Sequence, residues 1–145
     1  MDFFTAMDIS SSALSAERTR MNTISSNLAN ANSTRSSDGS VYRRRNPIFS
    51  ATPLMERGAV AVPAAGGQGV KKVMVAQIVE DLSPPRLHYD PNHPDADEKG
   101  YVALPNVNVV EEMADMISAT RAYEANITAT QAAKSMAMKT LELGR

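Results

Sequence analysis

The chain has 145 residues, with 15 basic and 16 acidic side chains, so its formal net charge is −1. It therefore has no overall electrostatic field that would attract nucleic acid or an anionic membrane. It contains no cysteine, which excludes disulfides, zinc–thiolate sites and cysteine nucleophiles. It also has no run of about 18 apolar residues, so we expect no membrane-spanning helix.

The first predicted element is a helix that occupies most of residues 1–32. Apolar side chains recur along it every seven residues: Met7, Leu14, Met21 and Leu28, with Ile24 on the adjoining stripe. A sustained seven-residue repeat favours packing against a partner helix over burial in a globular core. Many other positions are Ser, Thr or Asn, which are mediocre helix formers. The N-terminal end has no basic region followed by an apolar stretch, so we expect no cleaved secretion signal.

Residues 33–105 have a different character, because they contain all eight prolines and six of the seven glycines. We predict that they form a small β-rich domain, inserted between two terminal helices and marginally stable by itself. The strand candidates are 71–80, which is the strongest, and 43–52, 86–89 and 100–104. Residues 59–69, rich in Gly and Ala, predict a flexible loop.

The last predicted element is a helix within residues 106–145. Asn108 and Glu111 have the spacing of a capping box, which marks a helix start. No proline or glycine follows until Gly144, so the helix can run for about 35 residues, or roughly 50 Å. Two interleaved seven-residue series follow it: Val109, Met116, Tyr123, Thr130 and Ala137, and Met113, Thr120, Ile127, Lys134 and Leu141.

These elements predict an α+β fold in which the two terminal helices pair as a coiled-coil-like module, with the β-rich domain between them. Each apolar stripe is narrow and includes Ala, Thr or Ser. Two such helices bury too little to offset the entropy of ordering their backbones, which costs ~1–2 kcal/mol per residue. We therefore expect oligomerisation. The residues expected at subunit interfaces are Met7, Leu14, Met21, Ile24, Leu28, Val109, Met113, Met116, Thr120, Tyr123, Ile127 and Leu141.

The residues that most suggest chemistry lie in the segment 86–100. Its possible metal ligands are His88, Asp90, His93, Asp95 and Asp97. Read as an EF-hand loop that begins at Asp95, the segment has Lys99 where an oxygen ligand is needed and Asn106 in place of the final Glu. We interpret it as a rigid, solvated turn and expect no metal and no other cofactor. No nucleophile motif, glycine-rich phosphate loop or spaced carboxylate pair indicates an enzyme.

The basic run Arg43–Arg45, next to Tyr42 and Phe49, could suggest a nucleic-acid site. The run is short, and the segment 80–99, with six acids and two bases, offsets its charge. We interpret the run as a solvated or subunit-contacting face. Two alternatives to a polymerising subunit stay open here: a helical adaptor that binds one foreign helix, and a small metal-dependent enzyme.

Four motifs resemble those of flagellar rod and hook proteins. The segment 25–32 (Ser-Ser-Asn-Leu-Ala-Asn-Ala-Asn) is similar to the N-terminal signature that this axial protein family shares. The segments 90–97, 100–108 and 121–126 look like more specific motifs of proximal rod members, and the similarity covers the whole chain. The motif residues are Asn27, Leu28, Asn30, Asp90, His93, Pro94, Tyr101, Pro105, Asn106, Asn108, Arg121, Tyr123, Glu124 and Asn126.

The resemblance implies a structural subunit of the proximal rod of the bacterial flagellar basal body, a drive shaft that transmits torque and encloses the export channel. It also implies export through the flagellar type III apparatus without a cleaved signal, and assembly in the periplasmic space. The implied partners are further copies of the chain, the rod proteins FlgB, FlgF and FlgG, and the adaptor FliE, with no nucleic acid and no small-molecule substrate. Another axial component, or a helical adaptor of a type III secretion apparatus, is the alternative.

Overall fold

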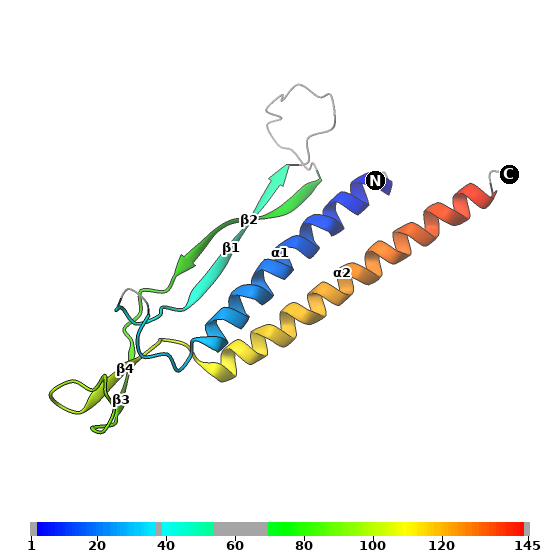
Figure 1. Ribbon diagram of the computed structural model, residues 1–145. Helices are drawn as coiled ribbons and strands as arrows, with labels where there is room; N and C mark the ends of the chain where they lie inside the picture. Colours follow the sequence, from blue (N-terminus) through cyan, green and yellow to red (C-terminus); the bar gives the residue numbers. More distant parts are fainter. Residues whose placement is uncertain (1–2, 37–38, 54–69, 144–145) are drawn as a thin grey trace.

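The computed structural model describes residues 3–36, 39–53 and 70–143 (Figure 1). The elements in chain order are α1 (Phe3–Ala29), β1 (Arg45–Pro53), β2 (Lys71–Glu80), β3 (Arg86–Tyr89), β4 (Tyr101–Leu104) and α2 (Val109–Leu143). The predicted α+β class is confirmed, since two long helices flank two antiparallel hairpins. The loop expected at 59–69 lies outside the described residues. No helix in the described ranges is long and apolar enough to cross a membrane.

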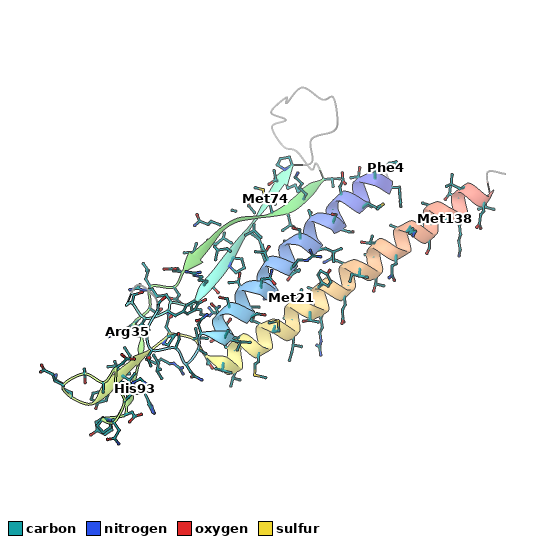
Figure 2. All side chains as sticks on the ribbon, in the orientation of Figure 1. Phe4, Met21, Arg35, Met74, His93 and Met138 are labelled. Atoms are coloured by element: carbon teal, nitrogen blue, oxygen red, sulfur yellow. The ribbon has the colours of Figure 1, made fainter. Side chains whose placement is uncertain are left out.

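The two helices run antiparallel and side by side, and α2 continues past Phe3 at the start of α1 (Figure 1). Helix α1 has 27 residues and α2 has 35. Met21 lies between them (Figure 2), where its sulfur is 3.8 Å from the hydroxyl oxygen of Thr120 on α2. Within the described residues, α1 buries no side chain before Ala16, and α2 buries none after Ala119. Burial is therefore concentrated at the end where the chain enters α2.

Asparagine side chains cap the end of α1 and the start of α2. The side-chain oxygen of Asn108 accepts a 3.2 Å hydrogen bond from the Val110 N–H, so the predicted N-cap of α2 is confirmed. After α1, the backbone and side-chain N–H groups of Asn30 both donate to the Ser26 carbonyl, at 3.1 and 2.8 Å. These bonds satisfy backbone groups that a helix terminus leaves without partners.

Strands β1 and β2 form an antiparallel hairpin that lies along α1 (Figure 1). The register shifts by one residue between Ile48 and Phe49, which is the signature of a β-bulge and increases the local twist. The hydroxyl of Ser12 on α1 accepts a 3.2 Å hydrogen bond from the Val73 N–H of β2. The polar face of α1 thus supports the hairpin directly.

Strands β3 and β4 form a second hairpin at the opposite end from the chain termini (Figure 1). The Asp97 carboxylate organises its connecting loop by accepting hydrogen bonds from the N–H groups of Lys99, at 2.9 Å, and Tyr101, at 2.8 Å. Across the described ranges, no three acidic or histidine side chains gather as a metal site. The segment forms a succession of turns, as its proline and aspartate content predicts.

The Gly100→Ala variant should destabilise the β3–β4 hairpin by about 2 kcal/mol, because it adds a steric clash to a left-handed backbone. Gly100 has φ +80°, and a Cβ there would lie 3.0 Å from Tyr89 Cε2 and 3.2 Å from Pro91 Cβ. Gly39 has φ +81° with nothing within 4 Å of a Cβ, so Gly39→Ala is a control for backbone strain alone. Amide hydrogen exchange in β3 and β4 measures the effect, and equal protection in both variants would contradict it.

Candidate assembly surfaces

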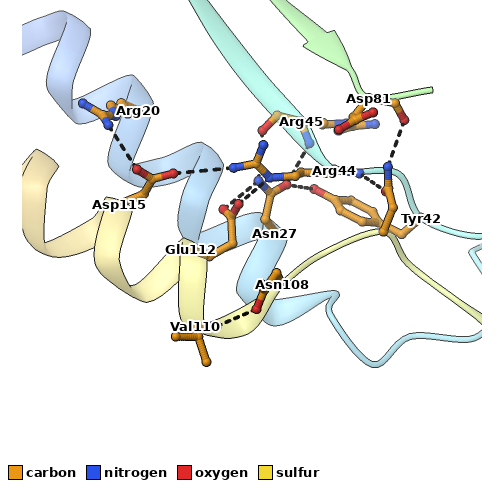
Figure 3. A network of polar contacts seen from close by, with 11 residues as sticks. Arg20, Asn27, Tyr42, Arg44, Arg45, Asp81, Asn108, Val110, Glu112 and Asp115 are labelled. Atoms are coloured by element: carbon orange, nitrogen blue, oxygen red, sulfur yellow. Dashed lines mark hydrogen bonds and ion pairs between the residues drawn. The ribbon is translucent and has the colours of Figure 1, made fainter. Parts of the chain in front are cut away.

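Asn27 lies at the centre of a polar network that joins α1, β1 and α2 (Figure 3). Its side-chain nitrogen donates to the Arg45 carbonyl and to Glu112 Oε2, both at 2.9 Å. Its side-chain oxygen accepts from the Tyr42 hydroxyl at 2.9 Å and from the Arg45 N–H at 3.0 Å. An asparagine amide has two donors and can accept two hydrogen bonds, so Asn27, only 1% exposed, uses its full capacity.

Glu112 and Arg44 form the charged half of the same network. The Glu112 carboxylate is fully buried, and its Oε1 accepts a 2.6 Å hydrogen bond from Arg44 Nε. The Arg44 guanidinium also lies 3.5 Å from Asp115, which in turn pairs with Arg20 of α1 at 3.5 Å. Burial lowers the pKa of Arg44, but the hydrogen bond and negative charge of Glu112 outweigh it and raise that pKa above its usual value. The arginine is therefore a permanent cation held against a buried carboxylate.

Asn106 connects this network to the segment after β2. Its side-chain oxygen accepts from the Arg44 N–H at 2.9 Å, and its side-chain nitrogen donates to the Asp81 carbonyl at 3.2 Å. The Asp81 N–H donates to the Arg44 carbonyl at 2.7 Å. The hydroxyl and N–H of Ser83 hold the pKa of Asp81 below its usual value, so this contribution to stability is present at neutral pH and is lost as the pH falls through the folded pKa.

We call the residues Asn27, Tyr42, Arg44, Asn106 and Glu112 the polar junction. Asn27 and Glu112 are 1% and 0% exposed, and Pro105 and Val107, on either side of Asn106 in the sequence, are buried as well. Water is thereby kept from hydrogen bonds that would otherwise be weakened by competition. The polar junction fixes where α1, β1 and α2 meet.

The structure distributes the predicted interface residues over three environments. Ile24 is buried within the chain. The half-buried positions are Leu14, Met21, Leu28, Met116, Tyr123 and Ile127, and the exposed ones are Met7, Val109, Met113, Thr120 and Leu141. Part of the seven-residue pattern thus serves the contact between α1 and α2 of one chain, and part of it is left uncovered. Their role between subunits stays a prediction.

An apolar stripe on the outer side of α2 was only partly included in the sequence prediction. It consists of Val110, Met113 and Ile117, all exposed. At 100° per residue these three positions lie on the side of the helix opposite Ala119, which is buried against α1. We call them the outer stripe. Their spacing of three and four residues was the signal that could have identified it.

The family-motif residues have separate structural roles. Asn27 and Asn106 belong to the polar junction, Asn108 caps α2, and Pro105 is buried beside the junction. Asp90, His93, Pro94 and Tyr101 lie in or beside the β3–β4 loop, where the His93 carbonyl accepts from the Ala96 N–H at 3.1 Å. On α2, Arg121 and Glu124 are exposed, and the Asn126 side chain donates to the Ala122 carbonyl at 2.9 Å.

The interpretation of the basic run as a solvated or subunit-contacting face is wrong for Arg44. Its side chain is only 19% exposed, because its guanidinium lies against Glu112. The neighbouring Arg43 and Arg45 are exposed, as expected. Sequence reasoning also missed Tyr42 and Glu112, since their partners are far away along the chain.

Two segments of the chain, which include most of α1 and all of α2, match flagellar family models. Residues 7–35 match a model described as flagella basal body rod protein, and residues 98–143 match one described as flagellar basal body rod FlgEFG protein C-terminal. The chain is 46% identical to the flagellar basal-body rod protein FlgC of Borreliella burgdorferi, over 94% of this chain and 93% of that protein. It is 43% identical to FlgC of Salmonella typhimurium and 42% identical to FlgC of Bacillus subtilis, over the full length of both chains in each pair.

The chain belongs to the FlgC family of flagellar basal-body rod proteins. The family assignment makes it a structural component of the flagellum, and these relatives are named as rod proteins and not as enzymes. Two residues of the polar junction lie on the helices of this FlgC-family chain and within the matched segments: Asn27 on α1 and Glu112 on α2. The arginine and tyrosine that complete the junction, Arg44 and Tyr42, lie between those segments.

Proposed function

We propose that the chain is a subunit of the proximal flagellar rod that polymerises through its two terminal helices. The observation that carries the proposal is the outer stripe of α2, an apolar surface with no cover from the rest of the described chain. Isolated exposed apolar residues are ordinary, but three on one helical face in a protein of an assembling family indicate a contact surface. The drive shaft would gain its stiffness from close packing of such helices around the axis.

The helical module, residues 1–32 and 106–145, is the axial core in this proposal, and residues 33–105 lie outside it. The concentration of burial near the polar junction supports this division of roles. The halves of α1 and α2 that lie farther from the junction have no buried side chain among the described residues. Helices from neighbouring subunits would cover them and enclose the export channel.

The proposed place of assembly is the periplasmic space, after export through the flagellar type III apparatus. The proposed neighbours are other copies of the chain, FlgB, FlgF and FlgG along the rod, and FliE at its base. The family assignment and the resemblance of the sequence motifs support these neighbours. The helices order fully when neighbours supply the missing burial, which suits a subunit that must pass unfolded through a narrow channel.

The Ile117→Asp variant should abolish swimming while leaving the monomer folded. Ile117 is 55% exposed, so a charge there costs the monomer little, within about 0.5 kcal/mol. In an apolar contact between subunits the same charge would be buried without a partner. Ser118→Asp is the matched control, because Ser118 is exposed on another face of α2. Thermal unfolding and soft-agar motility measure the two effects, and normal swimming of Ile117→Asp would contradict the assigned surface.

A further inference from the structure

The outward face of the β3–β4 hairpin is an exposed apolar surface. The register pairs Leu87 with Ala103 and Tyr89 with Tyr101, so these four side chains share one face of the sheet. Leu87 is 68% exposed and Tyr89 is 61% exposed. The rings of Tyr89 and Tyr101 lie edge to face, with their centres 5.3 Å apart. Tyrosines of this kind supply large, amphipathic contact area and are frequent at the centres of protein interfaces.

No other helix or strand of the described chain covers this hairpin. Hydrogen bonds to other segments hold it instead: at its base Arg86 Nε donates to the Pro105 carbonyl at 3.1 Å, and at its connecting loop Asp95 accepts from the Thr34 hydroxyl at 2.8 Å. A two-stranded sheet alone is marginally stable in water. Its apolar face would gain stability from a partner.

The loop beside this face is acidic. Residues 90–100 contain four acids, Asp90, Asp95, Asp97 and Glu98, and one base, Lys99, for a net charge of −3 with histidine neutral. Asp95 is paired with Arg35 at 3.6 Å, and Asp97 holds the loop. The Glu98 carboxylate has no hydrogen bond or ion pair among the described residues. The partner surface should therefore be apolar with basic residues beside it.

The β1–β2 hairpin of the same chain offers such a surface. Met74 is 50% exposed, and Lys72, two residues before it, lies on the same face of β2, with Lys71 next to it at the start of the strand. Neither lysine ammonium group has an ion-pair partner within 3–36, 39–53 and 70–143. The start of β2 and the β3–β4 loop lie at opposite ends of the molecule (Figure 1), and Figure 2 shows Met74 and His93 far apart in the same way. One chain cannot bring these two surfaces together.

We propose that the β3–β4 face of one copy, Leu87, Tyr89 and Tyr101, packs on the β1–β2 hairpin of a second copy, with Glu98 facing Lys72. Apolar residues form the centre of the contact and opposite charges its rim, as in other specific interfaces. Two different surfaces meet, so the contact is heterologous and continues from copy to copy as a ring or a helix. The proposed contact depends on the proposed rod function in one respect only, because it requires copies of the chain to lie side by side.

Site-specific cross-linking of purified basal bodies tests the contact. The natural chain has no cysteine, so the double variant Lys72→Cys, Glu98→Cys introduces the only two thiols of the protein. A short bis-maleimide reagent should join them into a product with the mass of two or more chains. The control pair, Lys139→Cys with Glu98→Cys, should give none. No product, or a product with the mass of this chain and a different protein, would overturn the proposal.

A charge exchange separates this contact from the rod function itself. For this test the reporter cysteines are placed next to the exchanged residues, as Lys71→Cys and Lys99→Cys. In that background, Lys72→Glu alone and Glu98→Lys alone should each reduce the amount of cross-linked product. The double exchange should restore the product. Failure of restoration in basal bodies that still assemble would overturn the contact but leave the rod function intact. Loss of basal bodies in Ile117→Asp tests the rod function independently, because Ile117 lies outside both hairpins.

Discussion

The Asn27→Asp variant is expected to lower the free energy of unfolding by about 3–5 kcal/mol at neutral pH. The Asn27 side-chain nitrogen donates to Glu112 Oε2 and to the Arg45 carbonyl, each at 2.9 Å. The substitution removes both donors and sets a second carboxylate against the buried Glu112 carboxylate. Like charges at this distance repel strongly where water is scarce, and two acceptors lose their partner.

The defect should shrink as the pH falls. Burial and the neighbouring Glu112 carboxylate raise the folded-state pKa of the new carboxyl above the ordinary aspartate value of about 4. The folded state then binds the proton more tightly than the unfolded state, so the penalty is fully present above the folded pKa and decreases below it. Urea unfolding at neutral and mildly acidic pH measures this difference.

The control for this prediction is Asn126→Asp. Asn126 is half-buried on α2, and its side chain donates a hydrogen bond to the Ala122 carbonyl within the same helix. Loss of one such local bond costs about 1 kcal/mol. A loss in Asn27→Asp that equals the control, or that is the same at both pH values, would show that Glu112 does not oppose the new charge.

The helices and strands were predictable because local signals mark them without reference to the rest of the chain. Asn108 supplies an N-cap, and the absence of Pro and Gly up to Gly144 lets α2 continue to Leu143. The apolar, β-branched run of Lys71–Glu80 predicted β2 with its observed bounds. The bounds of β1 differ by one or two residues, as strand ends do when pairing in space decides them.

The polar junction could not be predicted because its contacts are tertiary. Arg44 stands in a run of three arginines that sequence pattern cannot distinguish, and Glu112 is one of two acids in the first turn of α2. Acids at a helix start already have a local explanation in the helix dipole, so nothing in the sequence indicates that Glu112 is buried. Only the fold, which brings together residues 68 positions apart, selects this arginine and this glutamate.

The seven-residue repeat predicted that the helices pair, but not which positions face the partner helix. An α-helix has about 3.6 residues per turn, so positions seven residues apart do not quite line up, and a seven-residue repeat drifts around the helix surface over several turns. Met113 is exposed on the outer side of α2 and Met116 is half-buried, although the two adjacent series predicted both residues at subunit interfaces. Each of the two series on α2 therefore mixes the two kinds of position: Met116 and Ile127 are half-buried, whereas Val109 and Met113 are exposed.

The Glu112→Ala variant should lower the free energy of unfolding by about 3 kcal/mol, a large share of the 5–15 kcal/mol that stabilises a typical domain. The substitution leaves the Arg44 guanidinium, 19% exposed, without its 2.6 Å partner, and it leaves one Asn27 donor unpaired. Because Asp115 lies 3.5 Å from Arg44 and partly compensates its charge, the loss should fall at the lower end for a broken buried pair. Guanidinium unfolding measured by circular dichroism gives the value.

Glu111→Ala is the matched control, since Glu111 is exposed in the same helical turn and its loss should change stability by less than about 0.5 kcal/mol. Glu112→Gln should fall between the two, because it keeps an acceptor for Arg44 but removes the charge. If Glu112→Ala has the same free energy of unfolding as Glu111→Ala, the attraction between Arg44 and Glu112 contributes no more to stability than the desolvation of the pair costs. If it is destabilised as expected, swimming at permissive and raised temperature becomes informative. Loss of swimming confined to the higher temperature means that the polar junction stabilises the subunit, whereas loss at both means that it also sets the geometry in which α1, α2 and the hairpins meet their neighbours.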